Sequence, residues 1–360
     1  MKVTVEQDEI TSEISRIMDY EFDGTTTFYP HEFSAIDRET TLKDFGIGLI
    51  VGPSGSGKTT LLKEFGEEIE PYWFDNKSIA SHFDDVDDVQ DRLGAVGFNS
   101  IPSWLRPYHV LSNGEQFRAR LARQLDSNIV VDEFTSVIDR DVAKSCSNAI
   151  SRYVKRQNLR NIVFSSCHYD IIEWLQPDWV FDTHTGKLTT RGYQRPDIVL
   201  EIMPCTKDIW TTFSDHHYLD HHIHTGASCW VATWNDRLVG FLSSLSMPSG
   251  ALRNAWRAHR LVVLPEYQGL GIGARLTDAL GEIHIADGRR FYLKTSHPRL
   301  GEYCERSTKW RPTSKNKISR QDYYADTLKS DKGNSFNNLR HADRVCYSHE
   351  YIGACSDKHK

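Results

Sequence analysis

The sequence predicts an α/β protein with two consecutive domains, and three observations lead to this prediction. The chain has 360 residues, more than the roughly 100–200 residues of a typical single domain. Short β-branched runs alternate with helical stretches throughout the first half. The polar stretch Gly186–Pro196, GKLTTRGYQRP, lies between two apolar runs and holds two glycines and a proline, as connections between domains often do. We therefore expect domains at residues 1–190 and 191–360.

The strand patterns of the two halves differ. In the first half, Gly46–Val51, Asn128–Val131 and Asn161–Ser165 are short apolar runs, which predict strands of a buried parallel sheet. In the second half, two runs on either side of a short polar turn predict an antiparallel hairpin, namely Cys229–Thr233 and Arg237–Leu242. The second domain is therefore expected to have a mixed sheet.

Two more strands and one helix complete the second predicted domain. The strands are expected at Arg257–Leu264 and Arg290–Lys294. The helix between them is expected to start near Gly271, because apolar residues then recur at helical spacing, at Leu276, Leu280 and Ile283.

Composition excludes several classes of protein. Apolar residues make up 39% of the chain and charged residues 26%, which suits a folded protein rather than a disordered or fibrous one. No run approaches the roughly 20 apolar residues of a membrane-spanning helix, and the acidic N-terminal stretch is unlike a secretory leader. The seven cysteines form no Cys-x-x-Cys pattern, which favours reduced thiols. We expect a cytoplasmic protein with no membrane segment.

Charge is divided unevenly along the chain. The net charge of −6 combines residues 1–195, with 21 basic and 31 acidic residues, and residues 196–360, with 22 and 18. A polyanionic partner would therefore be expected to meet the second half.

Residues Gly52–Thr59, GPSGSGKT, match the pattern G-x-x-x-x-G-K-[ST] between a predicted strand and a helical pattern. Backbone N–H groups of such a loop converge on phosphate oxygens, and the helix start adds positive potential. Lys58 is expected to reach the β- and γ-phosphates of ATP, and the Thr59 hydroxyl to bind Mg²⁺. A chance glycine turn is the alternative. The predicted nucleotide-binding residues here are Gly52, Ser54, Gly55, Gly57, Lys58, Thr59 and Thr60.

The apolar run Asn128–Val131 ends in two carboxylates. Asp132 is expected to hold Mg²⁺, and Glu133 to polarise the attacking water as a general base. Acidic residues are common at strand ends. The pattern becomes specific because a phosphate-binding loop lies upstream of it.

A helix is predicted to begin within Leu111–Gln116, LSNGEQ. Ser112 precedes Glu115 by three residues, which is the spacing of a capping box. One explanation of the pattern is the helix cap alone. The functional explanation is that this helix start, with Ser112 and Gly114, faces a γ-phosphate.

Taken in order, GPSGSGKT, LSNGEQ, NIVVDE, SVID at Ser136–Asp139 and the later His168 resemble an ABC-type ATPase. The resemblance implies that Asp139 belongs to the D-loop. It also implies that His168 senses the γ-phosphate and acts with Glu133 in catalysis. In this family the signature helix completes the ATP site of a second copy, so the resemblance implies an ATP-dependent homodimer.

The same resemblance places an aromatic residue on the adenine ring. Tyr29 lies where the family often has this residue, and Phe28 and Phe33 compete for the role.

The sequence departs from the family in three places. Asn113 stands where the second signature residue is usually glycine, and only 53 residues separate Lys58 from Leu111. Asn99 is the nearest counterpart of the Q-loop glutamine. A reduced helical subdomain is therefore expected, and a transporter subunit is disfavoured.

A second glycine-rich turn, Gln268–Gly273, follows an apolar strand that ends at Pro265. Its glycines at 269, 271 and 273 let backbone N–H groups converge on an anion at a helix start. A turn used only for packing is one alternative, and a dinucleotide site is another, although such a site belongs early in a βαβ unit.

The strand, proline, Q-x-x-G-x-G and helix resemble motif A of the GNAT N-acetyltransferases, which binds the pyrophosphate of acetyl-CoA. The hairpin WVATWNDRLVGFL and the later strand and Trp310 extend the resemblance over about residues 197–353. It implies a GNAT-like mixed α/β domain after the ATPase domain. The implied acetyl-CoA-binding residues are Gln268, Gly269, Gly271 and Gly273, with the backbone of Val262 and Leu264 holding the thioester.

Acyl transfer needs a neutral amine, an oxyanion stabiliser and a proton for the leaving thiolate. Many GNAT enzymes carry a glutamate base on the fourth strand, where this sequence has Arg257 and His259. His259 is the candidate base, although a lone histidine is often structural. Tyr303 is the candidate acid, with Tyr324 and Tyr347 as alternatives.

Histidines gather in Asp215–His224, DHHYLDHHIH. His217 and His221 are four residues apart and could share a helix face for a metal, but no further ligand completes a site. A solvated or substrate-lining segment is the favoured interpretation of the His216–His224 cluster.

The stretch Arg306–Arg320 holds six basic residues and Trp310 but no acid. Basic groups neutralise phosphates and an aromatic ring stacks on bases, so the stretch predicts nucleic-acid contact. A solvated loop is the alternative.

The domain order resembles the group of ABC-type ATPases fused to a predicted acetyltransferase. We expect ATP binding and hydrolysis together with acyl transfer from acetyl-CoA to a nucleic-acid base or another large target. The alternative is an ATPase clamp whose second half only senses acyl-CoA, or acetylates a protein or small amine.

Overall fold

A computed structural model describes residues 2–27, 44–190, 192–217, 221–248, 252–319 and 345–353. The aromatic residues Tyr29, Phe28 and Phe33 and the alternative acid Tyr324 lie outside the described residues. The chain divides into two compact units. The first contains Met1–Glu70, Gln124–Ser136 and Val154–Gln194, and the second contains Pro71–Arg123, Val137–Tyr153 and Arg195–Lys360.

This division differs from a simple split near residue 190. The chain changes unit between Gln194 and Arg195, close to the predicted boundary. However, the two mainly helical segments Pro71–Arg123 and Val137–Tyr153 group with the C-terminal unit. The first half of the sequence therefore contributes to both units.

The first unit is built on a five-stranded sheet in the order β4-β5-β3-β6-β7. Its strands are β3 (Ile47–Val51), β4 (Val130–Val131), β5 (Ile162–Ser166), β6 (Trp179–Asp182) and β7 (Lys187–Thr190). The first four in this list pair in parallel, and β7 is antiparallel to β6. The predicted parallel sheet is confirmed. Part of the predicted linker is strand β7.

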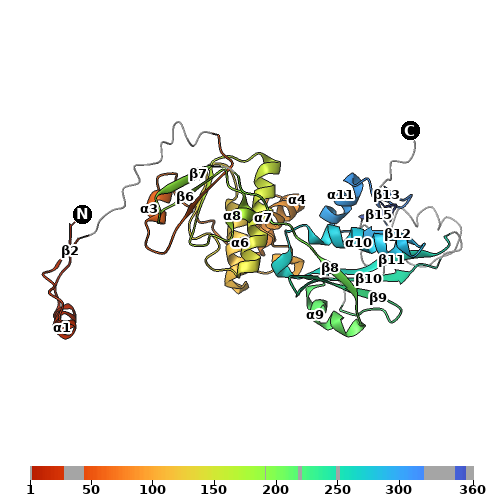
Figure 1. The fold of residues 1–360 in the computed structure, drawn as a ribbon, viewed down its shortest axis with the longest axis horizontal. Coiled ribbons are helices and arrows are strands. Elements are labelled where there is room, and N and C mark those ends of the chain that lie inside the picture. Colours follow the sequence, from red (N-terminus) through yellow and green to blue (C-terminus); the bar gives the residue numbers. More distant parts are fainter. Residues whose placement is uncertain are drawn as a thin grey trace. The chain divides into compact units, whose positions relative to one another are not determined.

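Continuous apolar runs form the parallel strands because the sheet is buried on both faces. All five residues of β3 are buried, as are all five of β5. The short helices α3 (Lys58–Leu62) and α8 (Ile172–Leu175) belong to the same unit (Figure 1). The core combines residues of strands and of α3, namely Phe45, Ile50, Leu61, Leu62, Val130, Val163, Trp179 and Phe181.

The N-terminal residues form a small element of their own. Strands β1 (Lys2–Thr4) and β2 (Thr25–Thr27) pair antiparallel around helix α1 (Glu9–Met18). Asp8 caps α1 by accepting from the Thr11 N–H. The helix is amphipathic and has no buried residue.

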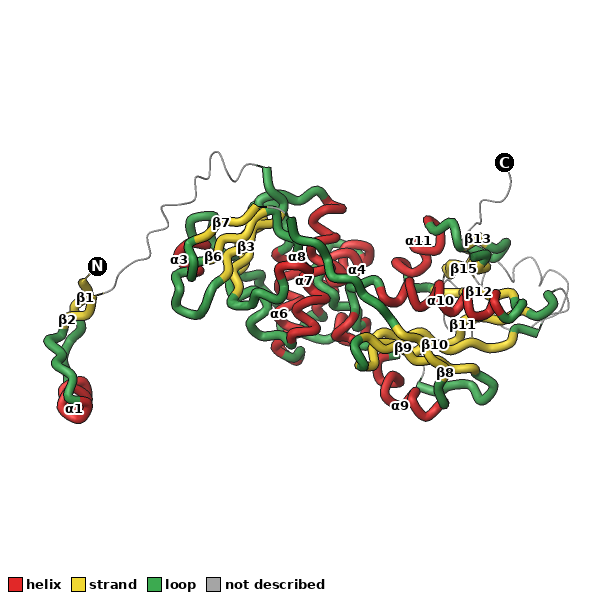
Figure 2. Tube along the Cα trace, in the orientation of Figure 1, coloured by secondary structure: helices red, strands yellow, loops and turns green. Residues whose placement is uncertain are grey.

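The second unit contains an eight-stranded sheet in the order β13-β15-β12-β11-β10-β9-β8, with β14 paired to β15. Figure 2 shows the strands side by side. Their bounds are β8 (Glu201–Pro204), β9 (Ser228–Trp234), β10 (Arg237–Ser246), β11 (Ala255–Val263), β12 (Arg290–Thr295), β13 (Trp310–Pro312), β14 (Ile318–Ser319) and β15 (Val345–Tyr351). The predicted hairpin is β9–β10, with Asn235 and Asp236 at positive φ in its turn. The predicted mixed sheet is confirmed.

Three helices cover this sheet. Helices α10 (Ile272–Ala286) and α11 (Pro298–Arg306) lie on one face and α9 (Trp210–Phe213) on the other (Figure 1). Alternation along β10 explains both contacts. A Cβ at Gly240 would clash with Leu276 of α10 (2.6 Å), whereas the adjacent Phe241 packs on Trp210 and Phe213 of α9.

The remaining helices of the second unit come from the first half of the sequence. They are α4 (Val86–Ala95), α5 (Ile101–Trp104), most of α6 (Asn113–Gln124) and most of α7 (Arg140–Gln157). Single turns of 3₁₀ helix lie before α4, at Ile79–His82, and between α5 and α6, at Tyr108–Val110. The predicted helix start at LSNGEQ is confirmed as the start of α6.

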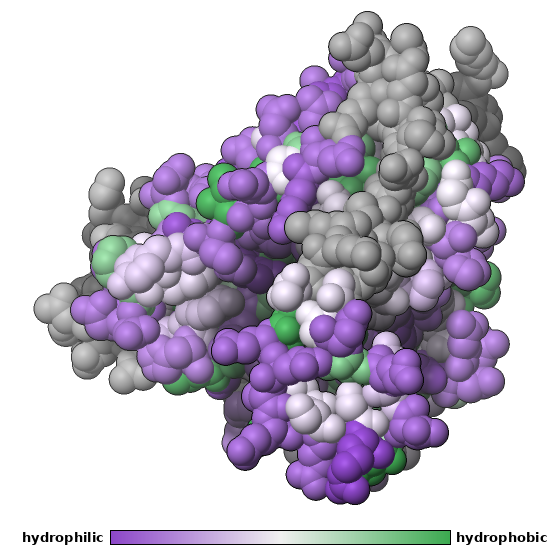
Figure 3. Space-filling model, turned by 90° about the vertical axis from the view of Figure 1, so that its left-hand side faces the viewer, coloured by the Kyte–Doolittle hydropathy of each residue, from purple (hydrophilic) through white to green (hydrophobic). Residues whose placement is uncertain are grey.

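Hydrophilic residues make up most of the face shown in Figure 3, and its apolar patches are small and separate. Scattered apolar side chains are normal on a protein surface. Among the residues that the structure describes, no helix is both long and apolar enough to cross a membrane.

Candidate functional sites

The phosphate-binding loop joins the buried strand β3 to helix α3. A Cβ at Gly52 would clash with the Thr183 hydroxyl, so only glycine fits there. Gly57 begins α3 in a left-handed conformation and no side chain caps the helix. The first N–H groups of α3 therefore have no side-chain partner and are available to an anion.

The loop is closed on itself by its lysine and by a neighbouring strand end. Lys58 Nζ donates to the Pro53 carbonyl at 2.8 Å. The Ser56 and Thr183 hydroxyls lie 2.5 Å apart. Space remains beside Gly55, where a Cβ would have no neighbour within 4 Å. A bound phosphate would replace the Pro53 carbonyl as the acceptor for Lys58, because a charged oxygen accepts a stronger hydrogen bond.

The two carboxylates after β4 lie at the same edge of the sheet as the loop, because β3, β5 and β4 are parallel. Asp132 accepts from the Ser165 hydroxyl and from the Glu133 N–H, the latter at 2.9 Å. Glu133 is exposed and has a φ of 47°. Asp132 is thus fixed by its neighbours, while the Glu133 side chain points from a strained backbone position.

Strand β5 lies between β3 and β4 and sends His168 out at this edge. The His168 N–H donates to the Ser166 hydroxyl at 3.1 Å, and His168 Nδ1 lies 3.1 Å from the Thr135 hydroxyl. The orientation of His168 is therefore set by Ser166, at the end of β5, and by Thr135, which follows Glu133 in the sequence. Asp132, Glu133, His168 and the phosphate-binding loop belong to one unit.

Ser112, Gly114 and Asp139 belong to the second unit. Ser112 and Glu115 form the predicted capping box, with the Ser112 N–H donating to Glu115 at 3.0 Å. Asp139 caps α7, because its carboxylate accepts from the Asp141 N–H at 2.8 Å. Ser112 and Asp139 are thus helix caps in this chain. Their predicted roles toward a phosphate stay predictions.

Glu115 is held ionised at this cap. Burial alone would raise its pKa, but hydrogen bonds from the Ser112 N–H and the Ser103 hydroxyl outweigh it and lower the pKa. The Ser103 hydroxyl donates to Glu115 at 2.8 Å. The carboxylate therefore ties the start of α6 to α5.

The second glycine turn begins α10 in nearly the same way as the first begins α3. Gly271 is the left-handed N-cap of this 15-residue helix and no side chain caps it. Gln268 donates through its side-chain amide to the Val263 carbonyl at 3.0 Å. Gln268 thus ties the turn to the end of β11.

Helix α7 packs directly on this turn. The Asn148 amide donates to the Gly269 carbonyl at 2.8 Å. A Cβ at Gly269 would lie 3.1 Å from Ala149 and from the Ser145 carbonyl, and one at Gly271 would lie 3.1 Å from the Arg152 guanidinium. The close approach of α7 and a φ of 95° both favour glycine at position 269, and Arg152 brings a positive charge to the start of α10.

Next to the turn, strands β11 and β12 separate. They pair in parallel only at Ala255–Arg257 with Arg290–Tyr292. Beyond these pairs β11 continues to Val263 paired to β10, while β12 continues to Thr295 beside β15. The two strands thus diverge towards the glycine turn, and backbone groups of β11 on that side have no strand partner among the residues that the structure describes. Val262 and Leu264 lie at this end.

His259 is surrounded by positive and neutral groups. Its Nε2 accepts from the His224 N–H at 3.2 Å. Burial, with smaller contributions from Arg260 and Arg257, lowers its pKa to about 4. His259 is therefore neutral at pH 7, but the lone pair of Nε2 is already used. The role of His259 as general base stays a prediction. The hydrogen bond from the His224 N–H argues against it, because it uses the nitrogen that would accept the proton.

Tyr303 donates to Asp278 Oδ2 at 2.6 Å. The buried Trp310 donates to the other oxygen of Asp278 at 2.8 Å, and Lys309 lies 3.3 Å from the carboxylate. Burial and this carboxylate raise the pKa of Tyr303 to about 12. The Tyr303 hydroxyl thus shares Asp278 with Trp310 and Lys309. A raised pKa means that this hydroxyl gives up its proton less readily. The alternative Tyr347 lies on β15, paired with Thr295.

The described histidines of Asp215–His224 make separate contacts. His221 lies 3.7 Å from Asp215, and His217 packs on the Trp210 ring. Among the described residues no group of three His, Cys, Asp or Glu side chains could hold a metal.

Much of the basic stretch is engaged within the fold. Arg311 pairs with Glu350 at 2.7 Å and Lys317 with Glu305 at 3.3 Å. Trp310 is only 4% exposed. The prediction that Trp310 stacks on a base is therefore wrong, because its ring packs in the core and its N–H is used by Asp278.

Sequence reasoning missed the contribution of α7. Asn148 and Arg152 fit no motif, since each is a single polar residue on a helix. The only available signal was the helix pattern that follows SVID, and it gives no hint of which face meets a turn more than 100 residues later.

Residues 195–302 match the model of the acetyltransferase (GNAT) family. No curated protein sequence matches the chain. The second half of the chain thus contains a region that matches this family.

Solved structures similar to parts of the chain fall into the same two groups. A Bacillus subtilis acetyltransferase in complex with CoA is 16% identical, with 43% of this chain and 98% of that one covered and a TM-score of 0.28. A dimeric ATP-binding cassette bound to ADP and phosphate is 14% identical, with 41% and 86% covered and a TM-score of 0.32. A cassette protein of an ABC transporter complex from Clostridium perfringens is 18% identical, with 41% and 78% covered and a TM-score of 0.32.

Proposed function

We propose that the protein binds and hydrolyses ATP at Gly52–Thr59 and transfers an acyl group from acyl-CoA at the turn Gln268–Gly273. The single observation that supports the second activity best is the divergence of β11 and β12 beside an uncapped helix start, within a region that matches the GNAT family. A thioester carrier needs both features: N–H groups for its pyrophosphate and a slot with free backbone groups for its amide-bearing arm.

The ATP site has the groups that hydrolysis requires. The exposed Thr59 hydroxyl and the Asp132 carboxylate are hard oxygen donors, and this donor set fits Mg²⁺. When bound, the ion would neutralise charge on the β- and γ-phosphates. Lys58 would bind the same phosphates, and Glu133 would accept the proton of the attacking water. His168 would be held toward the γ-phosphate by Thr135.

A homodimer is part of this proposal. The start of α6, with Ser112 and Gly114, and Asp139 would complete the ATP site of a second copy. A Glu133→Gln variant should bind ATP without hydrolysing it and sediment as a dimer with ATP and as a monomer without it. A monomer under both conditions would contradict this part.

In acyl transfer, the nitrogen of a neutral amine attacks the thioester carbonyl. The new N–C bond forms, the C–S bond breaks, and the amine proton leaves while the thiolate takes a proton. Backbone N–H groups near Val262 that are not paired to β10 would stabilise the oxyanion. The Leu264 N–H already donates to the Val239 carbonyl at 3.0 Å, so it is not one of these donors. His259 and Tyr303 remain the proposed base and acid. Their existing hydrogen bonds would have to open first.

The charges near His259 support a proposal for the class of acceptor. Arg257, Arg260 and the histidines of the neighbouring segment contribute positive or neutral groups near His259, which favours an amine carried on an anionic molecule. A nucleic-acid base on its phosphate backbone fits this description. Mass spectrometry of nucleic acid from cells expressing the wild type, Lys58→Ala or Gly271→Glu would detect a base adduct that depends on both sites.

A second candidate function is coenzyme sensing by the ATPase. The engaged states of Tyr303 and His259 favour it. A Gly271→Glu variant would place a carboxylate where the pyrophosphate binds and should abolish acyl-CoA binding and transfer while ATP hydrolysis continues. Acyl-CoA binding to the wild type with no transfer to any nucleic acid, protein or small amine would favour sensing.

A further inference from the structure

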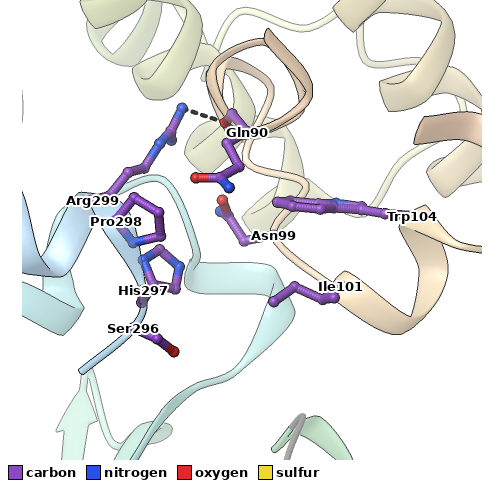
Figure 4. Close-up of a pocket in the computed structure, with 8 residues that line it drawn as sticks. All are labelled: Gln90, Asn99, Ile101, Trp104, Ser296, His297, Pro298 and Arg299. Atoms are coloured by element: carbon purple, nitrogen blue, oxygen red, sulfur yellow. Dashed lines mark hydrogen bonds between the residues drawn. The ribbon is translucent and has the colours of Figure 1, made fainter. Parts of the chain in front are cut away.

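A small pocket lies within the second unit (Figure 4). Its volume is about 120 Å³, close to that of an apolar cavity that holds a benzene ring, so it fits a section of a chain rather than a whole coenzyme. Two stretches nearly 200 residues apart form its walls: Gln90, Asn99, Ile101 and Trp104 on one side, and Ser296, His297, Pro298 and Arg299 on the other.

The two walls are joined by Arg299. Its guanidinium donates to the carbonyls of Gln90 and Asp91 at 2.8 and 2.9 Å. It also occupies the space beside Gly94, where any Cβ would clash with it. The end of α4 and the start of α11 are therefore docked to each other around this arginine.

The pocket adjoins the glycine turn. Gly97 packs on the turn, since its Cβ would lie 3.1 Å from the Gln268 carbonyl. Asn99, two residues further on, lines the pocket. The opposite wall starts directly after Thr295, where β12 ends. The pocket thus lies between the end of one diverging strand and the turn that begins α10.

The lining combines apolar surface with amide and imidazole groups. Trp104, Ile101 and Pro298 supply the apolar surface, and Figure 4 shows the Asn99 amide and the His297 ring facing the space between the walls. His297 Nδ1 is buried and has no hydrogen-bond partner among the described residues. A buried polar atom of this kind calls for a partner.

Hydrogen bonds within the first half of the sequence, including one to the start of α6, hold the pocket wall that contains Trp104 in place. The Trp104 N–H donates to the Phe98 carbonyl at 2.9 Å. Its neighbour Ser103 donates to Glu115 at the start of α6. These two hydrogen bonds fix the position of Trp104, so this side of the pocket has a defined shape before any ligand binds.

We infer that the coenzyme site is shared, with Asn99 and Trp104 from the first half of the sequence binding the amide-bearing pantetheine arm opposite His297. The inference rests on the proposed function and adds residues that lie outside the region that matches the GNAT family. An arm with alternating amides and methylene groups matches the mixed lining. The Asn99 amide and His297 Nδ1 would hydrogen-bond to amide groups of the arm, and the Trp104 ring would pack on its carbon chain.

The test is calorimetric titration of the full chain with CoA and with 3′-phospho-ADP, which keeps the nucleotide and pyrophosphate but lacks the arm. Trp104→Ala should raise the Kd for CoA about tenfold, equivalent to about 1.4 kcal/mol. Its Kd for 3′-phospho-ADP should stay within about twofold of the wild type, because only the arm contacts the ring.

Trp73→Ala is the matched control. Trp73 belongs to the same unit and stacks on Tyr108 at 4.5 Å, but it does not line the pocket. It should leave both affinities unchanged. Asn99→Ala removes only a polar end and is expected to weaken CoA about threefold, which decides the question if Trp104→Ala fails to fold by circular dichroism.

Wild-type CoA affinity in Trp104→Ala and Asn99→Ala would overturn the shared site and leave the proposed function intact. Equal weakening of CoA and 3′-phospho-ADP would overturn it too, because the effect would then not be on the arm. A wild type that binds neither ligand would instead remove the proposed function.

Discussion

The starts of helices α3 and α10 have nearly the same backbone and very different surroundings. Gly57 has φ 86° and ψ 13°, Gly271 has φ 81° and ψ 11°, and neither helix has a side-chain cap. Beside α3, a Cβ at Gly55 would meet nothing within 4 Å, whereas a Cβ at Gly269, before α10, would press on α7. The same local backbone therefore occurs in an open loop before α3 and in a turn before α10 that packs on α7. Only the turn before α10 depends on a neighbouring helix.

The largest expected effect separates the two turns by function. Lys58→Ala removes the cation of the first turn and should lower ATP hydrolysis by about 100-fold or more, since a charged donor to a phosphoryl group is lost. Release of inorganic phosphate measures this. CoA affinity should stay unchanged in the absence of ATP. A hydrolysis rate within about threefold of the wild type would contradict the assignment of the first turn.

The next comparison concerns stability. Gly269→Ala places a side chain at φ 95° and against Ala149 and Ser145, so it should lower the free energy of unfolding by about 3 kcal/mol. Gly55→Ala has only the backbone cost, about 1 kcal/mol, because its φ is 75° and its surroundings are open. Urea titrations measure both. Equal losses in the free energy of unfolding would mean that α7 shifts to accommodate the added methyl group at position 269.

A smaller effect is expected from the positive charge beside α10. Arg152→Gln should raise the Kd for CoA about fivefold at low salt, because an exposed guanidinium loses its attraction for the pyrophosphate. The effect should shrink as salt increases. Arg156→Gln, four residues further along α7, is the control. Identical affinities for Arg152→Gln and the wild type would show that the helix start alone binds the anion.

The smallest expected effect depends on pH. Burial, with a contribution from Arg289, lowers the pKa of His284 from 6.5 to about 4. Between these values the unfolded chain binds a proton that the folded chain does not, so stability falls as pH decreases from about 6.5 to about 4. The loss between pH 7 and pH 6 should be about 0.7 kcal/mol. Below about pH 4 this contribution levels off.

Chemical unfolding at both pH values, followed by tryptophan fluorescence, measures this dependence. The His284 ring lies between Trp256 and Phe291, and His284→Gln should flatten the pH dependence. A slope unchanged in that variant would assign the effect to other groups, with His259, whose pKa is lowered in the same direction, as the first to be tested.

Local patterns predicted most elements of the fold. The strands β3, β4 and β5, the hairpin β9–β10 and the starts of α6 and α10 lie where periodicity, capping residues and glycines placed them. These features depend on residues within a few positions of each other. The roles of single side chains were less predictable. Trp310 looked like an exposed aromatic in a basic stretch, but it begins strand β13, and Asp278 on helix α10 holds it in the core.

The sequence by itself determined two glycine-lined helix starts, the carboxylates after β4 and the type of each sheet, because each depends on short-range spacing. Only the tertiary structure decided that α4, α5 and most of α7 join the C-terminal unit, that Asn148 and Arg152 meet the second turn, and that Tyr303 is bound to Asp278. Contacts of this kind join residues more than 100 positions apart, or depend on which face of a helix is covered. Packing across the whole chain sets them, and no local pattern encodes it.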